Sequence, residues 1–145
     1  MSPDHAAHGS DAAGDAAAPH GPPAAEGSET VAGTLAEFRA FRERMNAEIL
    51  AEGNLVVNRF FALDTRTYEA GALDVRTKEL LGLVASLVLR CDDCITYHIV
   101  RCREEGVTRA EAFEAMSVGL VVGGSIVIPH FRRAVARWGE VEGKA

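Results

Sequence analysis

The sequence has 145 residues and a mass of 15.5 kDa, a length that allows one domain with a modest core and excludes large repeat arrays. Hydrophobic residues make up 48% of the chain and charged residues 25%, which excludes both a wholly disordered chain and a disulfide-stabilised scaffold. The net charge is −6, but residues 1–30 hold five acidic residues and no Lys or Arg, so the remainder carries 15 − 16 = −1 and lacks the basic excess that nucleic-acid binding requires.

Residues 1–30 differ in composition from the rest of the chain. They contain nine Ala, four Gly and four of the five Pro residues, and they lack Leu, Ile, Phe, Tyr and Trp. Such a segment buries too little apolar surface to offset the entropy that ordering would cost. We therefore expect a disordered tail over residues 1–30, followed by a helical domain over residues 31–145.

Helical spacing of apolar residues begins at Thr34. Thr34 and Glu37 form a capping-box pattern, which predicts the start of a first helix that ends at Gly53. A second helix is predicted from Asn54 to about residue 69, before Gly71.

Four more helices are predicted after Gly71. Asp74 caps a third helix that ends near residue 90, and a fourth runs from about residue 92 to residue 105. Thr108 and Glu111 form a second capping box, which opens the fifth helix. The sixth is predicted from about residue 125 to residue 138, and no stretch alternates with period two as a strand would. The fold class is therefore all-α, with about six helices.

The longest apolar run extends from Val118 to Pro129. It is too short to span a bilayer, and the start of the sequence has neither the basic nor the apolar segment of a secretory signal. We therefore expect a cytoplasmic protein with no membrane partner. The run is apolar on more than one helical face, which exceeds what a small helical monomer can hide and predicts self-association.

Two cysteines lie where the third predicted helix ends and the fourth begins, in the sequence Cys91-Asp92-Asp93-Cys94. This spacing permits a disulfide with little backbone movement, and a helix N-terminus stabilises thiolates. The charges of Asp92 and Asp93 oppose that stabilisation. The chain's three cysteines favour thiol chemistry, metal binding or simple burial over a structural disulfide framework.

His98 follows Cys94 by four residues, which places both on one face of a helix, so that His98 can accept the thiol proton. This geometry favours Cys94 as the attacking thiol and Cys91 as the resolving one, while the sequence leaves their order open. Glu79 lies on the preceding helix. Its periodicity alone is typical of a solvated surface charge, but it would face the fourth helix if the two helices packed antiparallel.

Cys91, Cys94, His98 and Cys102 superficially match a four-ligand zinc pattern. On one helix Cys94 and Cys102 are about 12 Å apart along the axis, whereas zinc holds its ligands within about 2.3 Å. One ion therefore cannot bind both, and a three-ligand site remains as an alternative. We expect Cys102 to be a buried small apolar residue, and we expect neither a resident metal ion nor another cofactor.

Glu79 followed by Cys91-x-x-Cys94-x-x-x-His98, with Gly123-Gly124-Ser125 before the last helix, resembles the carboxymuconolactone decarboxylase family, specifically its AhpD-like alkylhydroperoxidase branch. The resemblance covers about residues 35–138. It implies an all-helical fold and assembly into a homotrimer or homohexamer. It also implies that the cysteine pair cycles between dithiol and disulfide, with Glu79 and His98 forming its proton relay.

The chain departs from the pattern of that branch in two respects. Asp93 stands where the longer members carry a relay histidine, and the chain is similar in length to the short single-unit members. The resemblance implies a thiol peroxidase or disulfide oxidoreductase that acts on a hydroperoxide or another small molecule, with a thiol reductant system as its partner. Two alternatives remain: lactone chemistry with Glu79 and His98 as acid and base, and a non-catalytic oligomeric module. True lactone decarboxylases lack the cysteine pair, which favours the redox function.

Overall fold

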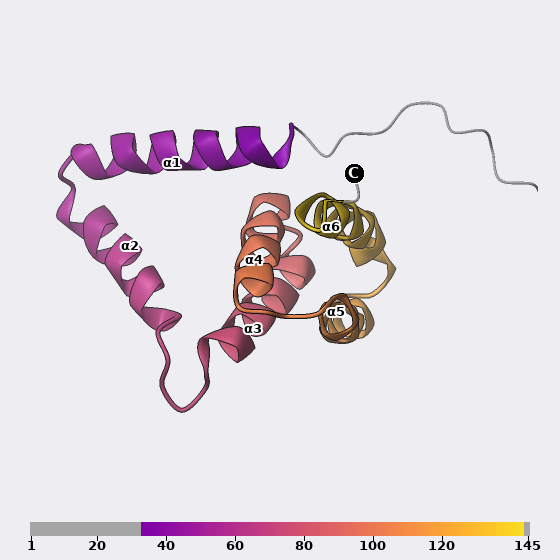
Figure 1. The fold of residues 1–145 in the computed structure, drawn as a ribbon. Coiled ribbons are helices and arrows are strands. Elements are labelled where there is room, and N and C mark those ends of the chain that lie inside the picture. Colours follow the sequence, from indigo (N-terminus) through magenta and orange to yellow (C-terminus); the bar gives the residue numbers. More distant parts are fainter. Residues whose placement is uncertain (1–32, 144–145) are drawn as a thin grey trace, which may run out of the picture.

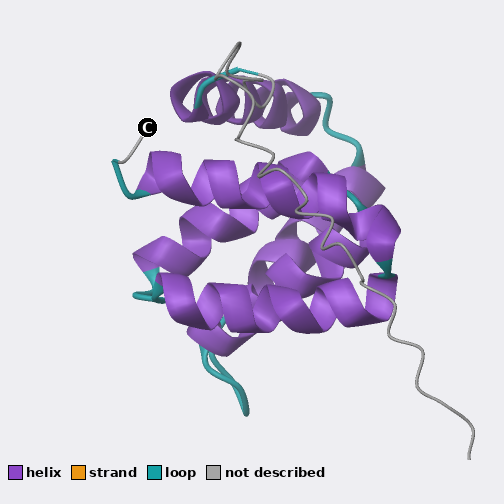
Figure 2. Cartoon of the chain, turned by 90° about the vertical axis from the view of Figure 1, so that its right-hand side faces the viewer, coloured by secondary structure: helices purple, strands orange, loops and turns teal. Residues whose placement is uncertain are grey.

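The computed structural model describes residues 33–143, and the part of the chain that it describes is helical, without a strand (Figure 2). In chain order the elements are α1 (Leu35–Ala51), α2 (Leu55–Thr67), α3 (Val75–Leu89), α4 (Asp92–Glu104), α5 (Arg109–Gly123), the short 3-10 helix η1 (Ser125–Val127) and α6 (Ile128–Val141) (Figure 1). The all-α prediction with six helices is therefore confirmed. The tail expected over residues 1–30 lies outside the described residues.

Local capping interactions start most of these helices. Thr34 and Thr108 each form the expected capping box, in which the threonine hydroxyl accepts from the N–H of Glu37 or Glu111 and that glutamate accepts from the threonine N–H. Asp74 caps α3 by accepting from the N–H of Thr77 at 2.7 Å. These starts were predictable because each depends on residues within one helical turn.

The start of the last helix differs from the prediction. Gly124 adopts a φ of 74°, a left-handed conformation that ends α5 and turns the chain. The 3-10 helix η1 follows, and α6 begins at Ile128 rather than near Ser125. Pro129 lies in the first turn of α6, where its missing N–H costs no hydrogen bond.

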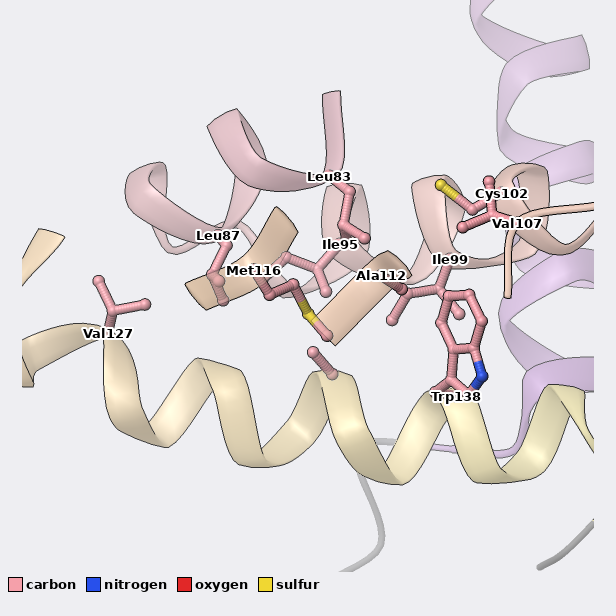
Figure 3. Packing of buried hydrophobic residues seen from close by; sticks show 11 residues of the cluster. Leu83, Leu87, Ile95, Ile99, Cys102, Val107, Ala112, Met116, Val127 and Trp138 are labelled. Atoms are coloured by element: carbon pink, nitrogen blue, oxygen red, sulfur yellow. The ribbon is translucent and has the colours of Figure 1, made fainter. Parts of the chain in front are cut away.

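The core lies among the four C-terminal helices. Helix α3 packs against α4 and α5, and α4 also packs against α6. Figure 3 shows side chains from these helices meeting above α6, with Trp138 at one end of the row and Val127 at the other. The buried apolar cluster consists of Leu83, Leu87, Ile95, Ile99, Cys102, Val107, Ala112, Met116, Val127, Ala134 and Trp138.

Helices α1 and α2 extend away from this core as an arm, defined here as residues 35–67 (Figure 1). Neither helix contains a buried residue. The arm exposes the large apolar side chains Phe41, Ile49, Leu50, Leu55, Val56, Phe60 and Leu63. A second exposed apolar surface, called the α5 face below, consists of Val118, Val121, Val122 and Ile126. Within residues 33–143, every helix is too short or too polar to cross a lipid bilayer.

Candidate active site

A disulfide joins Cys91 and Cys94 at the start of α4. Arg90 ends α3 in the left-handed region, with a φ of 61°, and this turn places Cys91 at the N-cap of the next helix. The Sγ atom of Cys91 accepts from the N–H of Cys94 at 3.3 Å. Cys94 is exposed and Cys91 is half-buried, so the bond is accessible to an attacking thiol.

Glu79 of α3 and His98 of α4 form a buried pair, and His98 follows Cys94 by four residues on the same helix. The Glu79 side chain has no exposed surface, which shows that the surface position indicated by its periodicity was wrong. The Oε2 atom of Glu79 lies 2.8 Å from Nδ1 of His98. Its other oxygen accepts from Nε of Arg101 at 3.3 Å, so the buried carboxylate is bonded on both sides.

The imidazole of His98 lies against the backbone of α3. A Cβ atom at Gly82 would lie 2.7 Å from Nε2 of His98, a distance that real Cβ contacts do not reach. Glycine is therefore required at this position for the ring to lie where it does. Tyr97 packs on the same ring edge to face, with 5.2 Å between the ring centroids.

The second ring nitrogen of His98 contacts a residue that the sequence analysis did not identify. The hydroxyl of Tyr68, which follows α2, lies 3.4 Å from Nε2. Both nitrogens of His98 are thus within hydrogen-bonding range of Glu79 or Tyr68. In the described part of the chain neither cysteine sulfur is hydrogen-bonded to His98.

A cavity of about 440 Å³ opens beside the buried pair. Tyr68, Tyr97, Glu79 and Arg101 line it, together with Asp64, Thr65, Glu69, Val75 and Glu105. Burial raises the pKa of both tyrosines, and the nearby charge of Glu79 raises it further, so both hydroxyls keep their protons at neutral pH. The cavity therefore offers hydroxyl donors next to the carboxylate and the imidazole.

Asp92 is paired from the opposite side of α4. Its carboxylate lies 2.8 Å from Nδ1 of His130 and 3.2 Å from a guanidinium nitrogen of Arg133, both on α6. These partners offset the negative charge that was expected to oppose thiolate formation. Asp93, by contrast, is exposed.

Cys102 lies apart from this group. It is fully buried in the core, and burial, followed by the charge of Glu79, raises the pKa of its thiol to about 12. The thiol is therefore protonated and inert at neutral pH. Among residues 33–143, no three His, Cys, Asp or Glu side chains are grouped so that they could hold a metal ion.

Comparison with known proteins relates the chain to a known family. Residues 54–137 match the model of the carboxymuconolactone decarboxylase family, and this range contains Glu79, Cys91, Cys94 and His98. A curated protein of Paracoccus denitrificans, named uncharacterized protein 4 in cox locus, is 32% identical over 91 residues, which are 63% of this chain and 82% of that protein.

Solved structures agree with this assignment. Two structures of a Thermotoga maritima protein are similar to the chain. One has a TM-score of 0.73 and 56% identity, and covers 74% of this chain and 94% of the other. The second, described as a carboxymuconolactone decarboxylase family protein, has a TM-score of 0.69 and 54% identity over 75% and 97% of the two chains. A Legionella pneumophila protein with 22% identity and a TM-score of 0.68, covering 74% and 96%, shares the fold.

Proposed function

The chain belongs to the carboxymuconolactone decarboxylase family, and from that premise we propose that it is an AhpD-like thiol peroxidase or disulfide oxidoreductase. The observation that carries the proposal is the Cys91–Cys94 disulfide, with Cys94 exposed and one helical turn before His98 of the buried Glu79–His98 pair. A role in antioxidative response has been suggested for the Thermotoga maritima relative, which supports a redox function for this chain.

The proposed cycle begins with the reduced pair. The thiolate of Cys94 attacks the terminal oxygen of a hydroperoxide, the O–O bond breaks, and the products are a cysteine sulfenic acid and an alkoxide that takes up a proton to become the alcohol. The thiol of Cys91 then attacks the sulfenic sulfur and releases water as the disulfide forms. Two thiols of a reductant system reduce this disulfide and become a disulfide themselves. The sum is one hydroperoxide and two reductant thiols converted to alcohol, water and one disulfide.

In this cycle His98 accepts the proton of the attacking thiol and Glu79 orients it. A thiol is a weak nucleophile until it is deprotonated, so a base that is held in place by a third group is the usual device for activating one. The carboxylate of Glu79 accepts a hydrogen bond from the N–H at Nδ1 of His98. The proton thus stays on Nδ1, and the lone pair of Nε2 is the basic site. Arg101 partly offsets the carboxylate's charge.

A thiol titration combined with a peroxide assay tests the proposal. We reduce the protein and titrate its three thiols under denaturing conditions, before and after one equivalent of cumene hydroperoxide. Two thiols should be lost per chain, one equivalent of alcohol should form, and turnover should continue with dithiothreitol as reductant. The lactone and non-catalytic alternatives predict that one equivalent of cumene hydroperoxide leaves the number of free thiols unchanged.

Variants of the three cysteines separate their roles. Cys91→Ser and Cys94→Ser should each abolish turnover, and only Cys91→Ser should still yield a trappable sulfenic acid if Cys94 attacks first. Cys102→Ala is the matched control and should retain turnover, because this thiol is buried and protonated. Serine variants that both reduce peroxide as fast as the parent protein would contradict the proposed function.

A further inference from the structure

Tyr68 is placed to control the state of His98. It follows the last residue of α2, and its hydroxyl lies 3.4 Å from Nε2 of His98, with 5.3 Å between the two ring centroids. Tyr68 lines the 440 Å³ cavity and also a second cavity of about 380 Å³, whose other lining residues are Thr67, Lys78, Leu81, Gly82 and Ala85. Tyr68 thus contacts His98 and borders both cavities.

Lys78 fixes the backbone on both sides of Tyr68. Its ammonium group donates to the carbonyl oxygen of Thr67 at 2.8 Å and to that of Glu69 at 2.6 Å. Charge-assisted bonds of this length are about twice as strong as neutral ones. Lys78 lies next to Glu79 on α3, and Gly82, which makes room for the imidazole, follows one turn later. One segment of α3 thus positions the tyrosine, the carboxylate and the ring.

The chemistry of the proposed base creates a requirement that Tyr68 meets. An imidazolium has no free nitrogen lone pair and cannot accept a thiol proton, so Nε2 of His98 must be unprotonated. The titratable and charged groups near the ring are Glu79 on α3, Tyr97 and Arg101 on α4, Asp64 on α2, and Tyr68 directly after α2. Among these, only the Tyr68 hydroxyl is hydrogen-bonded to Nε2, and a hydroxyl that donates there requires Nε2 to be unprotonated.

We propose that Tyr68 is a positioning residue for His98, whose hydroxyl holds the imidazole neutral with its proton on Nδ1, and that Lys78 holds Tyr68 in place for this purpose. The inference rests on the proposed function, in which Nε2 is the base. Burial raises the pKa of Tyr68, so the hydroxyl keeps the proton that it donates. A separation of 3.4 Å is long for a hydrogen bond. The bond from Tyr68 is therefore weak enough for Nε2 to accept the proton of a thiol in its place once the disulfide is reduced.

The first test measures which ring nitrogen of His98 carries a proton, by NMR on the full-length oxidised protein. Long-range ¹H–¹⁵N spectra at pH 7, assigned with the variant His98→Gln, should show Nδ1 protonated and Nε2 unprotonated. Tyr68→Phe removes only the hydroxyl, and in this variant Nε2 should become protonated or the two tautomers should mix. Tyr97→Phe is the matched control, because that ring also packs on His98 without bonding to a nitrogen, and its spectrum should keep the parent pattern.

The second test measures the rate of hydroperoxide reduction and its dependence on pH. Tyr68→Phe should slow hydroperoxide reduction by about tenfold, the equivalent of one hydrogen bond, and should move the acidic limb of the pH–rate profile to higher pH. Lys78→Met should have the same effect on spectrum and profile, and Lys78→Arg, which keeps a cationic donor, should restore part of the parent behaviour. A structural role alone would lower stability and leave the pH profile in place.

The outcomes distinguish this inference from the proposed function. Parent-like nitrogen signals in Tyr68→Phe would overturn the inference, whatever the activity of the protein. A protein that consumes no hydroperoxide, but whose His98 signals respond to Tyr68→Phe, would overturn the proposed function and support the hydrogen bond.

Discussion

His98 is bonded through both of its ring nitrogens, and each bond predicts the effect of a substitution. His98→Ala removes the proposed base and should slow hydroperoxide reduction by roughly 10²-fold, the usual lower range for a general base. Glu79→Gln keeps an acceptor near Nδ1 but loses the charge that stabilises the protonated ring, so it should cause a related loss. Stopped-flow measurement of the rate between pH 5 and pH 9 checks both.

Glu114→Gln is the matched control for these substitutions. Glu114 is an exposed carboxylate on α5, far in the sequence from the pair, and the same change there should leave the rate and its pH profile unaltered. An unchanged pH–rate profile in both His98→Ala and Glu79→Gln would remove the two residues from the relay.

The sequence predicted some residues of the candidate site and missed others for a physical reason. His98 was predictable because it lies four residues from Cys94 on one helix. Glu79 was identified through the family resemblance, since its periodicity indicated the surface, and its burial depends on how α3 packs against α4. Tyr68 is 30 residues from His98 and belongs to another element, so no local pattern relates the two.

At the scale of elements, the capping box that starts α5 makes the stability of the fold depend on pH. Glu111 closes the capping box of α5 and forms an ion pair with Arg76 of α3. Bonding to the backbone N–H of Thr108, followed by Arg76, lowers the pKa of Glu111 to about 2 from its ordinary value of 4.5. The ionised carboxylate therefore stabilises the fold fully above about pH 4.5, and this contribution is lost as the pH falls toward 2.

Glu111→Gln should accordingly lower the melting temperature at pH 7, and its difference from the parent protein should shrink as the pH falls from 4.5 toward 2. Thr108→Ala, which removes the hydroxyl of the same cap, should lower the free energy of unfolding by about 1 kcal/mol. Thermal denaturation followed by circular dichroism at several pH values measures both. A melting-temperature difference for Glu111→Gln that stays constant down to pH 2 would contradict the assignment, and Glu114→Gln on the same helix serves as control.

Helix starts were more predictable than the path between helices. The capping residues Thr34, Asp74 and Thr108 act within one turn, and their sequence patterns indicated the correct starts. The passage from α5 to α6 was not predicted, because Gly124 permits several backbone paths and tertiary packing of Val127 selects one of them.

At the scale of the whole molecule, the arm and the α5 face remain apolar and uncovered. Phe60 is 67% exposed on the arm, and Val121 is 84% exposed on the α5 face. Apolar surface left in water costs about 25 cal/mol per Å², so patches of this extent favour association. We propose that other copies of the chain cover them in a closed homotrimer or homohexamer, a number that rests on the family resemblance.

Light scattering should therefore return three or six times the chain mass of 15.5 kDa at micromolar concentration. Phe60→Glu and Val121→Glu should each shift the mass toward that of the single chain while the far-ultraviolet circular dichroism stays helical, because both side chains lie outside the core. Val121→Ile preserves the apolar surface and should keep the parent mass. A parent protein with a mass near 15.5 kDa would contradict the proposed assembly.

The arm ends at Thr67, directly before Tyr68, so the segment proposed to present apolar surface to other copies is continuous with a residue that contacts His98. Thermodynamic linkage makes such a connection reciprocal. If covering the arm changes the disulfide–dithiol equilibrium of Cys91 and Cys94 by some factor, reduction of that disulfide must change the affinity between subunits by the same factor. The oxidation state of one cysteine pair and the concentration at which chains assemble would then be two readings of a single free energy.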